Sequence, residues 1–378
     1  MDQAIDEILE LTTEEGLLEA RPRTSQYQWV HDKVQEAVFA LVSIQKLRRL
    51  KYRVGSILIA QLETGDADVA IFVIVNLLNE GIDLRIESSC FVGVDRVRLA
   101  ELNLQATRKA VALSAFTSAS KYAKKGIHLL PENSWSEHYD MALELNSYAA
   151  ESEGSLGNKE AMEYYCNKVL NRSEVPLSDK LRVYYVLVDN MANTYRHKEA
   201  VDTLLTILKQ MGCSFPSTCL SKNLAIVFGL IRVKCSFRSL TPGDISNMPI
   251  MKDAKQIQTQ KLVERLGTCA YLCGSNEYVP LVPLCIFKNI NSTLRHGMCE
   301  YSPIYFSQFG FLLTGLLGDL QGGSKMADYA LLLLQKLEMR QEVGDSKTIL
   351  RTDGFILPRT RPAPLSFKPL LEGKCFLV

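Results

Sequence analysis

Apolar residues recur along most of the chain at the spacing of one helix face. The first such stripe consists of Val34, Ala37, Val38, Leu41 and Val42. Residues 99–113 and 181–195 carry stripes of the same kind. Because steps of three and four residues match the 3.6 residues of an α-helical turn, the pattern predicts amphipathic helices from residue 32 onward.

Short helical segments also resemble one another at a regular distance. The segment NKEAMEYYCNKVL at 158–170 resembles HKEAVDTLLTILK at 197–209, and a weaker copy occupies 324–337. Each has an alanine at the same point, namely Ala161, Ala200 and Ala327. A small side chain lets neighbouring helices approach closely, and a period of about 40 residues with two helices per unit is typical of helical-repeat proteins. The sequence therefore predicts an all-α fold, an α-solenoid of helix pairs that is tetratricopeptide-like or HEAT-like.

The first 43 residues have a different pattern. Residues 4–11 suit a short helix, and two strand-like runs at 17–20 and 27–30 are separated by a proline-containing loop at 21–26. A helix follows the second run, and this order of helix, hairpin and helix matches part of a winged-helix module. We expect a partial winged helix at 1–43, with the chain starting inside that module.

Prolines and glycines mark the remaining boundaries. Pro242, Gly243 and Pro249 interrupt the helical pattern between two apolar regions, which favours a linker there. The expected order is tetratricopeptide-like repeats at 44–235, a linker at 236–253, further repeat-like helices at 254–343 and an irregular or disordered tail at 344–378. The tail has four prolines after residue 350 and no helical period.

The charge balance gives no reason to expect nucleic acid as a partner. Lys and Arg number 43 and Asp and Glu 42, for a net charge of +1. Proteins that bind nucleic acid concentrate basic residues, and this balance shows no such excess. The hydrophobic fraction of 47% is enough for a large core.

The cysteines indicate the redox environment of the protein. Ten cysteines are scattered along the chain without the spacing of a disulfide framework, so we expect a reducing, cytoplasmic environment.

The longest uncharged run, at 301–318, includes Ser, Gln, Thr and Pro and is too polar for a membrane span. The last four residues, CFLV, resemble a prenylation box, but Phe376 and Val378 fit it poorly, so we expect no lipid on Cys375.

No motif predicts catalysis or metal binding. The stretch Gly318 to Lys325 contains glycines and a lysine, but its lysine and serine stand in the wrong order for a phosphate loop, so it favours a glycine-rich turn between helices. Cys269 and Cys273 have no second pair or nearby histidine to complete a zinc site. None of the five histidines lies in a nucleophile signature, and the carboxylates of Glu151 and Glu153 are expected to be solvated.

A His-Asp pair, His31 and Asp32, stands at the head of the first apolar stripe. Asp32 suits the N-cap of the helix, with Gln35 three residues later completing a capping box. An adjacent His-Asp pair also occurs in metal phosphohydrolases, but no matching set of further ligands is present. The capping interpretation leaves His31 without a role.

The stretch YQWVHDKVQEAVFALV at 27–42 resembles the end of the winged helix in STAND-type AAA/NACHT-like signalling ATPases. The segments at 68–84, 94–109 and 134–157 resemble the region that follows that winged helix. The similarity covers roughly 15–215 strongly and 250–340 weakly. Proteins with this pattern are large, with a serine/threonine kinase-like domain before the ATPase and often a GAF domain and a histidine kinase after it.

The resemblance implies a role for His31. In related ATPases a His-Asp pair at this position contacts the β-phosphate of bound ADP and keeps the molecule closed, so His31 is the candidate cofactor-binding residue. This chain itself contains no phosphate loop, no acidic magnesium-binding strand and no kinase motif. We therefore expect no cofactor unless an upstream nucleotide-binding domain supplies ADP or ATP.

Together these features predict a non-catalytic regulatory or scaffolding arm of a STAND-type signalling protein. Its expected partners are other proteins or other domains of the same parent, with no nucleic acid and no membrane span. Two alternatives stay open. The chain could be part of an ATP-binding ATPase or kinase whose catalytic module lies elsewhere, or a stand-alone tetratricopeptide-like adaptor.

Overall fold

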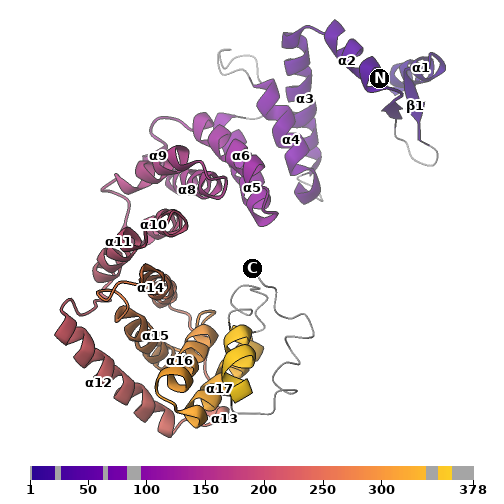
Figure 1. Ribbon diagram of the computed structural model, residues 1–378. Helices are drawn as coiled ribbons and strands as arrows, with labels where there is room; N and C mark the ends of the chain where they lie inside the picture. The colour runs from indigo at the N-terminus through magenta and orange to yellow at the C-terminus, as the bar shows by residue number, and fades with distance from the viewer. Residues whose placement is uncertain (1, 22–26, 63–66, 83–94, 338–347, 360–378) are drawn as a thin grey trace. The chain divides into compact units, whose positions relative to one another are not determined.

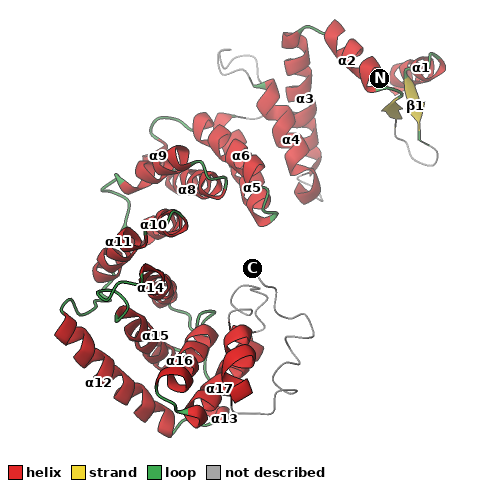
Figure 2. Ribbon diagram, in the orientation of Figure 1, coloured by secondary structure: helices red, strands yellow, loops and turns green. Residues whose placement is uncertain are grey.

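The computed structural model describes residues 2–21, 27–62, 67–82, 95–337 and 348–359 (Figure 1). The described residues are mostly helical, as Figure 2 shows, and the protein is all-α as predicted. The chain divides into two compact units, Met1–Val175 and Pro176–Val378.

The first unit begins with a helix, a hairpin and a second helix, in the order expected from the sequence. These elements are α1 (Asp2–Glu14), β1 (Leu18–Ala20), β2 (Tyr27–Trp29) and α2 (Asp32–Leu41). The two strands are antiparallel, with Leu18 opposite Trp29 and Ala20 opposite Tyr27. The loop expected at 21–26 lies, apart from Arg21, outside the described residues.

The rest of the first unit consists of helices that pack in sequence. They are α3 (Ile44–Leu62), α4 (Ala67–Gly81), α5 (Arg96–Ala112), α6 (Phe116–Leu129), α7 (Ser134–Glu137), α8 (Tyr139–Ser155) and α9 (Lys159–Leu170). The contacts join α3 to α4, α5 to α6, α6 to α8 and α8 to α9. The predicted stripe at 99–113 faces the core along α5, where Leu99, Leu102, Ala106 and Ala110 are buried, but Leu113 at the end of the helix is 63% exposed.

A partly buried amide pair joins two of these helices. Asn79 of α4 and Asn103 of α5 each donate a side-chain N–H to the other's carbonyl oxygen, at 2.8 and 3.0 Å. Asn103 is fully buried, and its amide also donates to the backbone oxygen of Leu99. The polar groups are therefore satisfied inside an otherwise apolar contact.

The second unit contains eight α-helices between residues 177 and 337. They are α10 (Leu177–Asn193), α11 (His197–Gln210), α12 (Cys219–Arg238), α13 (Pro242–Ser246), α14 (Ala254–Cys273), α15 (Leu281–His296), α16 (Ser302–Leu316) and α17 (Leu320–Leu337). Two short turns follow, η2 (Thr352–Ile356) and η3 (Leu357–Arg359). Ala200 and Ala327, two of the three equivalent alanines, are fully buried, whereas Ala161 of the first unit is half-buried.

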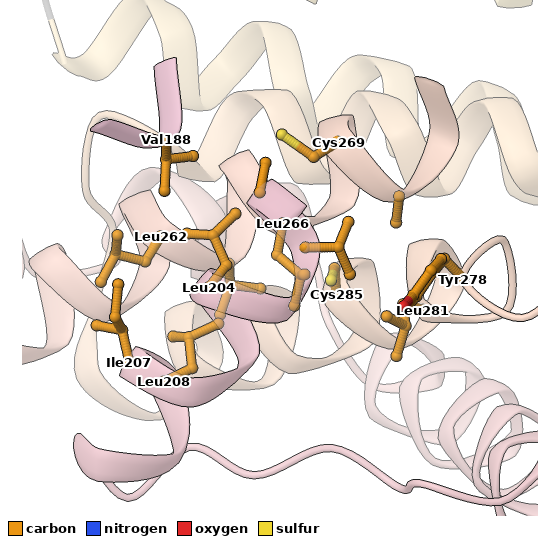
Figure 3. Packing of buried hydrophobic residues seen from close by; sticks show 14 of the residues in the cluster. Val188, Leu204, Ile207, Leu208, Leu262, Leu266, Cys269, Tyr278, Leu281 and Cys285 are labelled. Carbon is orange, nitrogen blue, oxygen red and sulfur yellow. The ribbon is translucent and has the colours of Figure 1, made fainter. Parts of the chain in front are cut away.

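One large hydrophobic cluster lies between α10, α11, α14 and α15. Figure 3 shows Val188 of α10, Leu204 and Ile207 of α11, and Leu262 and Leu266 of α14 directed toward one another. The predicted stripe on α10 contributes Leu181, Val188 and Ala192. The stripe does not continue to Tyr195, which lies after the helix with a positive φ and is 88% exposed.

The glycines of the stretch from 318 to 325 act in two different ways. Gly318 has a φ of +66° and ends α16, which suits a residue without a β-carbon. Gly323 lies within α17, where a β-carbon would overlap Thr314 Oγ1 and stand 3.0 Å from the carbonyl oxygen of Gly310. Only the beginning of the stretch is a turn. Its later residues belong to α17, where Gly323 allows α16 and α17 to pack closely.

The residues expected to form a linker at 236–253 lie inside the second unit and pack against it. α12 extends to Arg238, and Ile245, Met248 and Met251 are buried. Lys336 of α17 donates to the backbone oxygens of two residues in this stretch, at 2.5 and 2.7 Å. Pro242 is the first residue of α13, a position where proline is well tolerated, so the prolines of this stretch do not prevent it from packing.

Part of the stretch expected to be an irregular tail is folded. Residues 348–359 form helical turns, and Thr352, Ile356 and Leu357 are buried. Ile356 and Leu357 pack against Ala327 of α17. Residues 360–378, which include Cys375, lie outside the described residues.

Candidate functional site

His31 is the N-cap of α2. Its backbone is extended, with φ −150° and ψ 141°, and its Nδ1 accepts the backbone N–H of Lys33 at 3.0 Å. The prediction that Asp32 caps this helix is therefore wrong. Asp32 is the first helical residue, where a carboxylate still interacts favourably with the positive end of the helix dipole.

The cap also fixes the tautomer of the neutral imidazole. A nitrogen that accepts a hydrogen bond carries no proton, so the proton of neutral His31 is on Nε2. The side chain is exposed to solvent. His31 therefore combines a structural role with a remaining N–H donor, which is the group that a phosphate contact would use.

The buried cysteines are not poised for nucleophilic or metal chemistry. Burial raises the pKa of the Cys166 thiol to about 12 and that of Cys269 to about 11. At neutral pH both stay protonated, and the thiolate is the reactive and ligating form. The part of the chain that the structure describes holds no group of three or more His, Cys, Asp and Glu residues that could bind a metal.

Glu153 corrects another sequence expectation. It is 2% exposed rather than solvated, and its carboxylate accepts hydrogen bonds from Ser120, from Asn158 at 2.9 Å and from Lys124 at 2.6 Å. Burial raises the pKa of this carboxyl, but the hydrogen bonds from Lys124, Ser120 and Asn158 outweigh it and the pKa is lowered. The network joins α6, α8 and the turn before α9, and it has a structural role.

The outer face of α12 is the most distinctive surface of the second unit. Five large apolar side chains lie exposed at helical spacing: Leu220, Leu224, Val227, Phe228 and Ile231, with exposed fractions of 53% to 78%. We call these five residues the α12 stripe. Figure 1 shows α12 at the edge of this unit. Isolated exposed apolar residues are common, but a row along one helix face is typical of an interaction surface.

The opposite face of the same helix is also apolar and is buried. Val233 and Phe237 lie in a hydrophobic cluster with residues of α15, α16 and α17. Gly229 permits a close approach to α15, because a β-carbon there would stand 2.5 Å from the ring of Phe287. α12 is thus held firmly by one face while the α12 stripe is presented on the other. Sequence reasoning missed the stripe, although the helix carries apolar residues all round.

The described residues include no helix with the length and apolar character needed to cross a membrane. No family model matches the chain. The chain is similar to the hybrid signal transduction histidine kinase G of Dictyostelium discoideum, with 22% identity over 374 residues. The match covers 87% of this chain and 10% of that protein, so the chain spans about a tenth of its relative's length.

Proposed function

We propose that the chain is a non-catalytic regulatory arm of a signalling protein and that it acts by binding other proteins or other domains of its parent. The α12 stripe carries this proposal. A row of exposed Leu, Val, Phe and Ile side chains on a well-anchored helix is a surface that a partner's apolar groups would cover.

The residues of α12 also define the chemistry of the partner. The helix contains four basic residues and no acidic residue. One of the four, Lys234, pairs with Asp319 at 2.8 Å, and another, Lys222, is buried. Arg232 and Arg238 are exposed. A complementary surface would have an apolar centre and an acidic rim.

The finer architecture is part of the same proposal. Consecutive contacts within helix pairs support a tetratricopeptide-like α-solenoid, and the order of α1, the hairpin and α2 supports the end of a winged helix. The similarity to a hybrid histidine kinase over most of this chain supports a place in signal transduction. A STAND-type ATPase in the parent, and an ADP contact from His31, extend this proposal.

The two alternative functions are tested by the coding sequence upstream of this chain and by the size of the polypeptide in the cell. A G-x-x-x-x-G-K-[ST] motif encoded within about 300 residues upstream would agree with the regulatory arm and with an ATP-binding ATPase or kinase, whereas its absence would favour a stand-alone adaptor. An endogenous polypeptide of 42.4 kDa, the mass of this chain, would favour a stand-alone adaptor. A larger endogenous polypeptide would favour the regulatory arm.

The test of binding is quantitative co-isolation from the native cell. Leu224→Asp with Phe228→Asp places two charges in the α12 stripe without touching its buried face. The matched control is Leu113→Asp, which changes a leucine that is 63% exposed in the other unit. We expect the stripe variant to lose a defined subset of partners that the wild type and the control retain. The same partners in all three would contradict the proposal.

A further inference from the structure

The second unit also contains a polar cavity between helix ends. It has a volume of about 410 Å³ and is lined by residues that directly follow α11 and by residues of α12, α14 and α15. This volume is within the range of small-molecule sites in proteins. The cavity is distinct from the α12 stripe, none of whose residues line it.

Positive charge is concentrated in this cavity. Four cationic side chains line it from three helices: Arg232 on α12, Lys255 on α14, and Lys288 and Arg295 on α15. None of the lining residues that the structure describes is an aspartate or a glutamate. Since the net charge of the whole chain is only +1, the lining of the cavity is much more positively charged than the chain as a whole. Such a site attracts an anion.

A buried donor without a partner also lines the cavity. Gln260 is 1% exposed, and its Oε1 accepts from the Cys299 thiol at 3.0 Å while its backbone oxygen accepts from the Tyr305 hydroxyl at 3.1 Å. Its amide Nε2 has no hydrogen-bond partner among the described residues. The hydroxyl of Ser292, another lining residue, is also buried without a partner. Native proteins rarely leave such groups unsatisfied, so both point to an acceptor that a ligand would supply.

Part of the charge has a structural explanation. Arg295 lies in the last turn of α15, where a cation complements the negative end of the helix dipole. The Lys288 ammonium lies 4.9 Å from the ring centroid of Phe215. Neither explanation applies to Arg232 or Lys255, which reach the cavity from two other helices.

We propose that this cavity binds a small organic phosphate that carries two or more phosphoryl groups. Phosphoryl oxygens accept several charge-assisted hydrogen bonds at once, and guanidinium, ammonium and amide groups are all suitable donors. Four cations match a diphosphate or polyphosphate better than a single carboxylate. Soluble nucleotides, inositol phosphates and phosphoinositide head groups share this chemistry. The site goes beyond the proposed binding of proteins and would make the second unit responsive to a small molecule.

The test is isothermal titration calorimetry on the full chain with four probes. They are pyrophosphate, ATP, inositol trisphosphate, and phosphatidylcholine vesicles that contain a phosphoinositide. We expect at least one probe to bind at a single site, and Arg232→Gln with Lys255→Gln to weaken that binding at least tenfold. Binding of soluble probes identifies a soluble phosphate as the ligand class, and binding of vesicles alone identifies a lipid head group. Absence of binding by every probe at about 1 mM would overturn the proposal.

The matched control is Lys121→Gln with Lys198→Gln, which removes the same charge at two exposed positions outside the cavity. Equal weakening by the control pair would mean that the probes bind the general charge of the protein, and would overturn the assigned site. Gln260→Glu provides an independent check. It keeps an acceptor for Cys299 and replaces the amide donor by a carboxylate oxygen. A folded Gln260→Glu protein with wild-type affinity would also contradict the proposal.

Discussion

Gly323 of α17 lies directly against Thr314 of α16, so that a β-carbon on the glycine would overlap the threonine Oγ1. Gly323→Ala should therefore destabilise the protein by about 1–3 kcal/mol, the usual cost of overpacking a helix contact. The matched control is Gly315→Ala in α16, where the nearest atom to an added β-carbon is 3.9 Å away. Because alanine favours a helix over glycine, the control should be neutral or stabilising by up to about 1 kcal/mol.

Denaturant unfolding of the two alanine variants measures this difference directly. If Gly323→Ala were as stable as Gly315→Ala, the close contact between α16 and α17 would not exist as described. The same experiment tests a packing role for Gly323, because a phosphate-binding role alone would not make Gly323→Ala less stable than Gly315→Ala.

His31 is predicted to have two separable roles. His31→Ala removes the cap of α2 and should lower the stability of that helix by about 1 kcal/mol, whereas His31→Asp keeps a capping oxygen and should preserve it. Hydrogen exchange of the amides in the first turn of α2 measures the capping role. Equal protection in the alanine and aspartate variants would contradict it.

The phosphate contact of His31 is tested in a protein that also contains an upstream nucleotide-binding domain. There His31→Asp should release ADP faster than the wild type, because a carboxylate repels the β-phosphate and has no N–H to donate. Dissociation of a fluorescent ADP analogue provides the measurement. Unchanged release with an intact α2 would leave His31 as a helix cap alone.

The Glu153 network should make the first unit sensitive to acid. The folded pKa of this carboxyl is lowered relative to its unfolded value of about 4.3, so its contribution to stability is complete above that value and is lost as the pH falls through the folded pKa. Glu153→Gln should cost about 1–3 kcal/mol at pH 7 and reduce the loss of stability on acidification.

Urea unfolding between pH 7 and pH 3 distinguishes this carboxylate from the general effect of acid. The control is Glu132→Gln, since Glu132 is exposed and lies in the loop before α7. The control should follow the wild-type pH dependence. If Glu153→Gln also followed it at every pH, the buried network would contribute nothing to stability.

The helices could be predicted because the spacing of apolar residues that indicates a helix lies within the helix itself. The spacing of apolar residues was enough to predict the stripes on α5 and α10. The recurrence of a small residue at an equivalent point of each repeat was enough to predict close packing at Ala200 and Ala327, which are buried. The cap of α2 was harder, because His31 and Asp32 are both able to accept the first amide. The backbone angles at residue 31 and the hydrogen bond from the Lys33 N–H to His31 Nδ1 decide between them.

Features built from distant residues were not predictable in this way. Glu153 was expected to be solvated because its partners Ser120 and Lys124 come from another helix. The cavity around Gln260 draws on four segments that sequence spacing does not connect. The α12 stripe could not be predicted for a different reason. A helix that is apolar all round predicts burial on both faces, and the sequence does not say which face the protein itself covers.

Site-specific photocrosslinking from the α12 stripe is the most direct measurement of the central claim, that this chain acts through protein contacts. A photoreactive phenylalanine analogue at position 228 in the native cell should give a discrete adduct with one protein or with another domain of the parent. That adduct should disappear when Leu224→Asp is added, and the same analogue at position 113 should not form it. Identical products from both positions, or no product from position 228, would contradict the account.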